Sequence, residues 1–134
     1  MENLTINKKL RKDATVTKEL LASTVGSGTI DVYATPMVVA LMESAAAQLA
    51  AAELPVEFTT VGTKISIDHI SATPVNAEVY ATAEMTFTDG RKFEFVVEAY
   101  DNAGLIAKGT HERFSVNAEK FLLKAQSKFD KAGE

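Results

Sequence analysis

The chain has 134 residues, of which 46% are hydrophobic, and its formal net charge is −4. This length and composition predict a single domain over residues 1–134 with one hydrophobic core. The negative charge argues against nucleic acid as a partner, and the absence of cysteine excludes a disulfide framework, a thiolate metal site and a cysteine nucleophile. Because no apolar run near the N-terminus is long enough for a signal peptide, we expect a cytoplasmic protein.

The first third of the chain contains few regular patterns. Residues 1–12 carry several lysines and are expected to form a flexible, solvated arm. A short strand is predicted at residues 14–16. The glycines at residues 26 and 28 indicate that residues 23–28 form a loop.

A strongly apolar helix is predicted over residues 36–52. Thr35 is suited to the N-cap, and Pro36 to the first helical position, where its missing N–H has no partner to lose. Glu43 is the single charged residue of this segment. A helix that is apolar on nearly every face must be covered by protein or lipid. This one is too short and too polar to span a bilayer, so we expect a buried central helix and no membrane partner.

Strands are predicted over most of the remaining chain. Residues 60–70 alternate in polarity and place Ile65, Ile67 and His69 on one face. Residues 77–88 and 91–100 alternate in the same way and are joined by a hairpin at Asp89-Gly90. Their expected inward side chains are Val79, Ala81, Ala83, Met85 and Phe87 in the first strand and Phe93, Phe95, Val97 and Ala99 in the second.

The chain is expected to end with a strand and a helix. The strand is predicted over residues 105–116. Asn117 can cap an amphipathic helix over residues 118–131, whose apolar side carries Phe121, Leu122, Ala125 and Phe129 and whose lysines at positions 120, 124, 128 and 131 face water.

These elements predict an α+β fold in which an antiparallel β-sheet wraps around a central α-helix. A single curved sheet around one helix leaves open edges and uncovered apolar surface. Pairing with a second copy would cover both, so a homodimer is expected.

Glu43 and His69 are the residues most suggestive of chemistry. A lone carboxylate on a buried helix must be paired or protonated, which is compatible equally with a catalytic role and with a structural partner. His69 on an inward face is more often a hydrogen-bonded core residue. A carboxylate beside an imidazole, however, produces a base that works near neutral pH. Thr35 has a structural explanation as an N-cap, and about 12 Å of helix, at about 1.5 Å per residue, separates it from Glu43.

A second polar group surrounds His111 and Arg113. His111-Glu112 begins like the HExxH motif of zinc proteases, but Ser115 stands where the second His is required and the segment is predicted as a strand, so no metal site is expected. Arg113 is compatible equally with a salt bridge at the end of a strand and with a role in a site.

Three segments resemble the bacterial thioesterases related to fluoroacetyl-CoA thioesterase, which belong to the hot-dog superfamily. They read ATPMVVALMESAA, TVGTKISIDHISATPVNAEV and GLIAKGTHERFSVNAEKF, and the similarity extends over residues 13–124. The resemblance implies the hot-dog fold, a dimer with active sites at the subunit interface, and a catalytic set of Thr35, Glu43 and His69. It also implies that the Gly62 N–H faces the thioester oxygen and that Arg113 contributes to substrate binding.

The resemblance therefore predicts an acyl-CoA thioesterase that hydrolyses a small acyl-CoA without a cofactor. Residues 22–34 form a shorter and less aromatic segment than the lid of fluoroacetyl-CoA thioesterase, so fluoroacetyl specificity does not carry over. Two alternatives stay open: a hot-dog module that binds acyl-CoA or another small ligand without catalysis, and, behind it, an enoyl-CoA hydratase.

Overall fold

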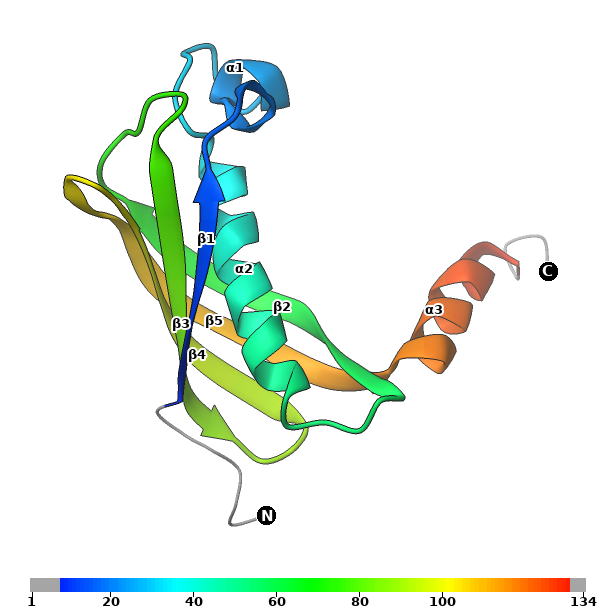
Figure 1. Cartoon of the computed structure of the whole chain (residues 1–134). Coiled ribbons are helices and arrows are strands. Elements are labelled where there is room, and N and C mark those ends of the chain that lie inside the picture. The colour runs from blue at the N-terminus through cyan, green and yellow to red at the C-terminus, as the bar shows by residue number, and fades with distance from the viewer. Residues whose placement is uncertain (1–7, 131–134) are drawn as a thin grey trace.

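The computed structural model describes residues 8–130, and Figure 1 shows them as one curved sheet with a long helix against it. The strands are β1 (Lys9–Thr15), β2 (Phe58–His69), β3 (Glu78–Thr88), β4 (Lys92–Asp101) and β5 (Gly104–Asn117). The helices are α1 (Ala22–Val25), α2 (Thr35–Ala51) and α3 (Ala118–Gln126), with the short 3-10 turns η1 (Lys18–Leu20) and η2 (Ser127–Phe129).

The five strands form one antiparallel sheet in the order β1-β3-β4-β5-β2. The hairpin predicted at Asp89-Gly90 joins β3 to β4, and Gly90 adopts the positive φ of 93° that such a turn requires. β1 and β2 are the two edges of the sheet. The long strand β2 therefore has a free edge within the described chain.

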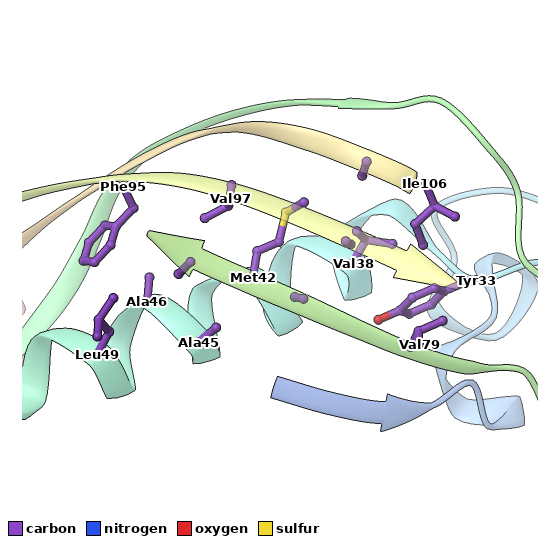
Figure 2. Close-up of a cluster of buried hydrophobic side chains, with 14 of the residues drawn as sticks. Tyr33, Val38, Met42, Ala45, Ala46, Leu49, Val79, Phe95, Val97 and Ile106 are labelled. Carbon is purple, nitrogen blue, oxygen red and sulfur yellow. The ribbon is translucent and has the colours of Figure 1, made fainter. Parts of the chain in front are cut away.

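The core lies between the sheet and one face of α2 (Figure 2). Val38, Met42 and Leu49 are fully buried on this face, and Ala45, Ala46 and Ala50 lie between them. The small alanines let the helix backbone approach the sheet closely, while the larger side chains interleave with Phe95 and Val97 of β4 and with Val79 of β3. Truncating Met42 or Leu49 to alanine would cost about 2–5 kcal/mol. The predicted antiparallel sheet packed against an apolar helix is confirmed, but only one face of α2 is buried within the described chain.

Several element boundaries differ from the prediction. The first strand starts at Lys9, where its partner is Glu84 of β3, so part of the expected arm is paired sheet. The segment expected to be a loop begins with the short helix α1, which ends at Gly26 in the left-handed conformation (φ 92°). Residues 1–7 of the expected arm lie outside the described residues.

Two outward-facing regions also differ from the prediction. A register shift between Met85 and Phe87 turns the Phe87 side chain outward, so it is exposed rather than in the core. α3 is capped by Asn117 as predicted but ends at Gln126, and η2 continues to Phe129; position 131 of the predicted helix lies outside the described residues. The expected apolar side of α3 is exposed, because the helix lies apart from the sheet and α2 (Figure 1).

No helix within residues 8–130 is long and apolar enough to cross a membrane.

Candidate active site

The first turn of α2 and the last residue of β2 place Thr35 beside His69. The Thr35 hydroxyl lies 2.7 Å from His69 Nδ1. The predicted N-cap role of Thr35 is wrong: the N-cap position belongs to Ala34, no side chain caps the helix, and Thr35 is its first residue. Its hydroxyl is thereby free to bond His69, and the structural explanation that competed with a site role no longer applies.

A pocket of about 300 Å³ opens next to this pair. Thr35 and His69 form part of its wall, and the remaining lining residues come from the α1 region, from the segment before α2 and from the loop after β2: Ala22, Ser27, Val32, Tyr33, Ile70, Ser71 and Ala72. Its size is at the lower end of ordinary small-molecule sites. It is large enough for a short acyl group next to the Thr35 hydroxyl.

His69 is held in its neutral form by its surroundings. Burial lowers the pKa of the imidazole, and the nearby Ser71 backbone offsets part of that change. The Nε2 atom is buried and makes no well-formed hydrogen bond within residues 8–130. A neutral imidazole that contacts a hydroxyl through Nδ1 can accept a proton from it.

Glu43, two turns further along α2, lies in a different cluster. Its Oε2 atom is 3.7 Å from Arg113 Nη1 and 4.0 Å from His111 Nε2, both on β5. The Glu43 side chain is 40% exposed in the single chain, whereas the imidazole of His111 is 1% exposed and the guanidinium of Arg113 is 9% exposed. The Glu43 carboxylate is therefore partly exposed to solvent, whereas the Arg113 guanidinium beside it is buried.

Gly62 of β2 completes this cluster because a side chain at its position would displace the Glu43 carboxylate. A Cβ atom there would lie 2.5 Å from Glu43 Oε2 and 3.2 Å from both Arg113 Nη1 and His111 Cε1. The strand register shifts between Gly62 and Lys64, which is the local change that a β-bulge produces near functional sites. The three side chains thus converge on the bare backbone of Gly62.

The structure groups the predicted residues in two sets. Thr35 and His69 form one set, and Glu43, Gly62 and Arg113 form the other; within one chain the expected meeting of Glu43 with His69 is replaced by these separate contacts. The sequence did not predict His111 as a member of the site, because it was considered only as a metal ligand. The alternation of β5 offered the signal, because it places His111 and Arg113 on the same inward face.

In the described part of the chain, no three His, Cys, Asp or Glu side chains gather as a metal site would require. The His111-Glu112 pair lies on β5, as the strand prediction required, so its two side chains point to opposite faces of the sheet.

One antiparallel sheet packed against a long helix defines a hot-dog protein of the thioesterase class. The family model described as fluoroacetyl-CoA-specific thioesterase matches residues 16–119. The chain belongs to this family, which confirms the predicted hot-dog fold and the thioesterase class.

Individual relatives agree with the assignment. The fluoroacetyl-CoA thioesterase of Streptantibioticus cattleyicolor is 38% identical over 98 residues, which are 73% of this chain and 70% of that protein. A solved structure of the fluoroacetyl-CoA thioesterase FlK superposes with a TM-score of 0.89 at 30% identity and covers 94% of this chain and 98% of its own. A thioesterase superfamily member from Thermus thermophilus, 24% identical with a TM-score of 0.86 over all of both chains, shares the fold.

Proposed function

We propose that this protein hydrolyses a small acyl-CoA to the free acid and CoA, with Thr35, Glu43 and His69 as catalytic residues. The observation that carries the proposal is the 2.7 Å contact between the Thr35 hydroxyl and His69 Nδ1 at the wall of the 300 Å³ pocket. A hydroxyl bonded to a neutral imidazole beside a cavity is the arrangement that general-base chemistry needs. The pocket accepts the acyl group, while the CoA remains outside it.

In the proposed reaction, Thr35 and His69 act together as the proton acceptor. Thr35 takes a proton from the attacking water as it passes its own proton to His69 Nδ1. The oxygen of water bonds to the thioester carbonyl carbon, and the oxyanion that forms is stabilised by the Gly62 N–H. The C–S bond then breaks, and the CoA thiolate recovers the proton from His69. Glu43 orients the water and stabilises the imidazolium formed during the step.

This mechanism requires Glu43 and His69 to meet, and a homodimer provides a route. Within one chain about 12 Å of helix separates Thr35 from Glu43. Along β2, Gly62 and His69 are seven residues apart, or about 23 Å at about 3.3 Å per residue. We infer that each site combines Thr35 and His69 of one subunit with Glu43, Gly62 and Arg113 of the other.

The free edge of β2 supports this pairing. If two β2 edges pair antiparallel about a twofold axis near the middle of the strand, one subunit's His69 lies opposite the other subunit's Phe58. In such a dimer, His69 of one subunit is about 13 Å along the strand from Gly62 of the partner subunit, whereas the two residues are about 23 Å apart within one chain. The same contact covers Phe58, which is 41% exposed, and the exposed carboxylate of Glu43. The cytoplasmic location stays a prediction from the sequence.

Thiol release from short acyl-CoAs, beginning with acetyl-CoA, tests the activity. Glu43→Gln and His69→Asn should each lower kcat by about 10²–10⁴-fold, because each removes a group that moves or stabilises the transferred proton. Both variants should retain the wild-type Tm within a few degrees, since Glu43 is 40% exposed, His69 lies at a pocket wall, and both substitutions are close in shape to the native side chain. A wild-type protein that binds acyl-CoA and leaves the thioester intact would establish the binding module instead.

Subunit complementation tests the composite site. Glu43→Gln is mixed with the double variant Thr35→Ala/His69→Asn, and the subunits are exchanged by refolding. If each site uses both subunits, half of the random dimers carry one intact site, and about a quarter of the wild-type activity returns. Mixing Glu43→Gln with itself is the control. Recovery no greater than in the control would place each site within one chain.

A further inference from the structure

His111 is the most deeply buried polar group near the site, and the proposed reaction does not use it. Its side chain is 1% exposed and lies close to Lys64 of β2, to Glu43 of α2 and to the ring of Phe95. A buried polar side chain must have its hydrogen bonds satisfied. The two ring nitrogens of His111 have different partners, and these partners determine where its proton lies.

The Nδ1 atom of His111 lies 2.7 Å from the backbone carbonyl oxygen of Lys64. A carbonyl oxygen can only accept, so Nδ1 carries the proton and donates it. The Nε2 atom lies 3.2 Å from Arg113 Nη1, and a guanidinium can only donate. Nε2 is therefore the acceptor, and His111 is a neutral imidazole in a single tautomer.

Arg113 is fixed by three hydrogen bonds, one from each nitrogen of its guanidinium. Its Nε donates to Thr60 Oγ1 at 2.8 Å, its Nη2 donates to the Thr60 carbonyl oxygen at 2.9 Å, and its Nη1 donates to His111. The 3.7 Å between Nη1 and Glu43 Oε2 is an ion-pair distance, too long for a hydrogen bond. Each guanidinium nitrogen thus has a hydrogen-bond partner other than Glu43, so Arg113 attracts the carboxylate by charge and leaves its oxygens free for a reacting group.

We propose that His111 is a positioning residue: as a hydrogen-bond acceptor it draws Arg113 Nη1 away from Glu43, so that the carboxylate is held by charge but keeps its oxygens available. The inference rests on the proposed catalytic role of Glu43. Without the acceptor, Nη1 turns to Glu43 Oε2, which lies 3.7 Å away, and forms a direct hydrogen bond. The carboxylate is then tied to Arg113 and displaced from the substrate.

Two amide substitutions separate the two bonds of His111. In His111→Gln, the amide oxygen is the same number of bonds from Cβ as Nε2, so it can accept from Arg113 while the bond to Lys64 is lost. In His111→Asn, the amide nitrogen is the same number of bonds from Cβ as Nδ1, so it can donate to Lys64 while the acceptor for Arg113 is lost. The pair is matched, since each variant keeps one bond and removes the other.

We expect His111→Asn to lower kcat for acetyl-CoA by about 10- to 100-fold with little change in KM, because a displacement of about 1 Å in a reacting group has an effect of this size. His111→Gln should retain most of the wild-type kcat. A residue that merely holds β2 to β5 through Lys64 predicts the reverse order, with activity following Tm. That order, or equal kcat in the two variants, would overturn the proposal.

A measurement that needs no turnover keeps this test separate from the proposed function. Nitrogen-15 NMR detects the guanidinium N–H protons of Arg113, which exchange slowly and show hindered rotation about Cζ–Nη1 when Nη1 is bonded. We expect the Arg113 Nη1 environment of His111→Gln to resemble that of the wild type and that of His111→Asn to shift. An unchanged Nη1 signal in His111→Asn contradicts the positioning role even if the wild-type protein hydrolyses no acyl-CoA.

Discussion

The two polar clusters along α2 are built by different means. At the start of the helix, Thr35 and His69 are joined by one short hydrogen bond next to an open pocket, so each partner has a single close neighbour that fixes it. In the middle of the helix, Glu43 forms an ion pair at 3.7 Å with Arg113 and lies 4.0 Å from the neutral His111. Its position depends on the fixed guanidinium and on the empty space above Gly62. The first cluster depends on one hydrogen bond, and the second depends on shape and charge. Substitutions that add or remove a small group should therefore affect the two clusters differently.

Gly62→Ala is expected to damage the second cluster most and to leave the first one unchanged. The added Cβ would lie 2.5 Å from Glu43 Oε2, so the carboxylate must move. Since a shift of about 1 Å in a reacting group costs about 100-fold, kcat should fall by about that factor. Steady-state thiol release measures it.

Gly109→Ala is the contrasting control, because the conflict there is with backbone. Its Cβ would lie 1.9 Å from the Ser66 carbonyl oxygen, where β2 and β5 approach closely. This variant should lose stability, visible as a lower Tm, whereas Gly62→Ala should lose activity with a smaller change in Tm. If Gly62→Ala keeps wild-type kcat, the shape argument for the second cluster is incorrect.

Thr35 offers a milder test, directed at the first cluster. Thr35→Ala removes the hydroxyl bonded to His69 Nδ1 and should lower kcat by at least about tenfold, while Thr35→Ser keeps the hydroxyl and most of the activity. Because Thr35 is not the N-cap, Thr35→Ala should lower the free energy of unfolding only by the hydrogen bond to His69, about 0.5–1.5 kcal/mol. Chemical denaturation measures this loss, and the same loss in Thr35→Ala when His69→Asn is already present would contradict it.

The strands and turns of the fold could be predicted from the sequence better than the contacts within the candidate site. Alternation in β3 and β4 and the Asp89-Gly90 turn predicted the central hairpin, because each depends on neighbours along the chain. The exposure of Phe87 was not predicted, since it follows from a register shift that polarity alone does not reveal. Local rules therefore succeeded where the structure is regular.

Local sequence rules were also insufficient to predict the contacts within the candidate site. Thr35, Glu43 and His69 were predicted as site residues, but contacts in the two clusters join residues far apart in the sequence: Thr35 bonds a residue 34 positions later, and Arg113 bonds one 53 positions earlier. The first contact depends on the packing of α2 against the sheet and the second on the pairing of β5 with β2, and no local pattern encodes either. Thr35 also fitted an N-cap by residue type, and a one-residue difference in where the helix begins changed its role.

Acid sensitivity provides the smallest expected effect and compares the two imidazoles directly. Burial lowers the pKa of both His69 and His111; for His111 the charge of Arg113 adds to the lowering, while Lys64 and the carboxylates of Glu43 and Glu112 oppose it. In the pH range between the lowered folded pKa and the ordinary value of about 6.5, the unfolded chain binds more protons than the folded one. The stabilisation is therefore complete above about pH 6.5 and is lost as the pH falls through the folded pKa.

Tm should fall between pH 7 and pH 5, and carboxylates will contribute to this fall in every variant. The contribution of each imidazole is the difference between the wild type and a variant without it. His111→Gln should reduce the fall more than His69→Asn does, because His111 is 1% exposed and lies beside a permanent cation, whereas His69 lies at a pocket wall. Equal falls in the wild type and in His111→Gln would show that the buried imidazole is protonated without cost, which is incompatible with its role as the acceptor for Arg113.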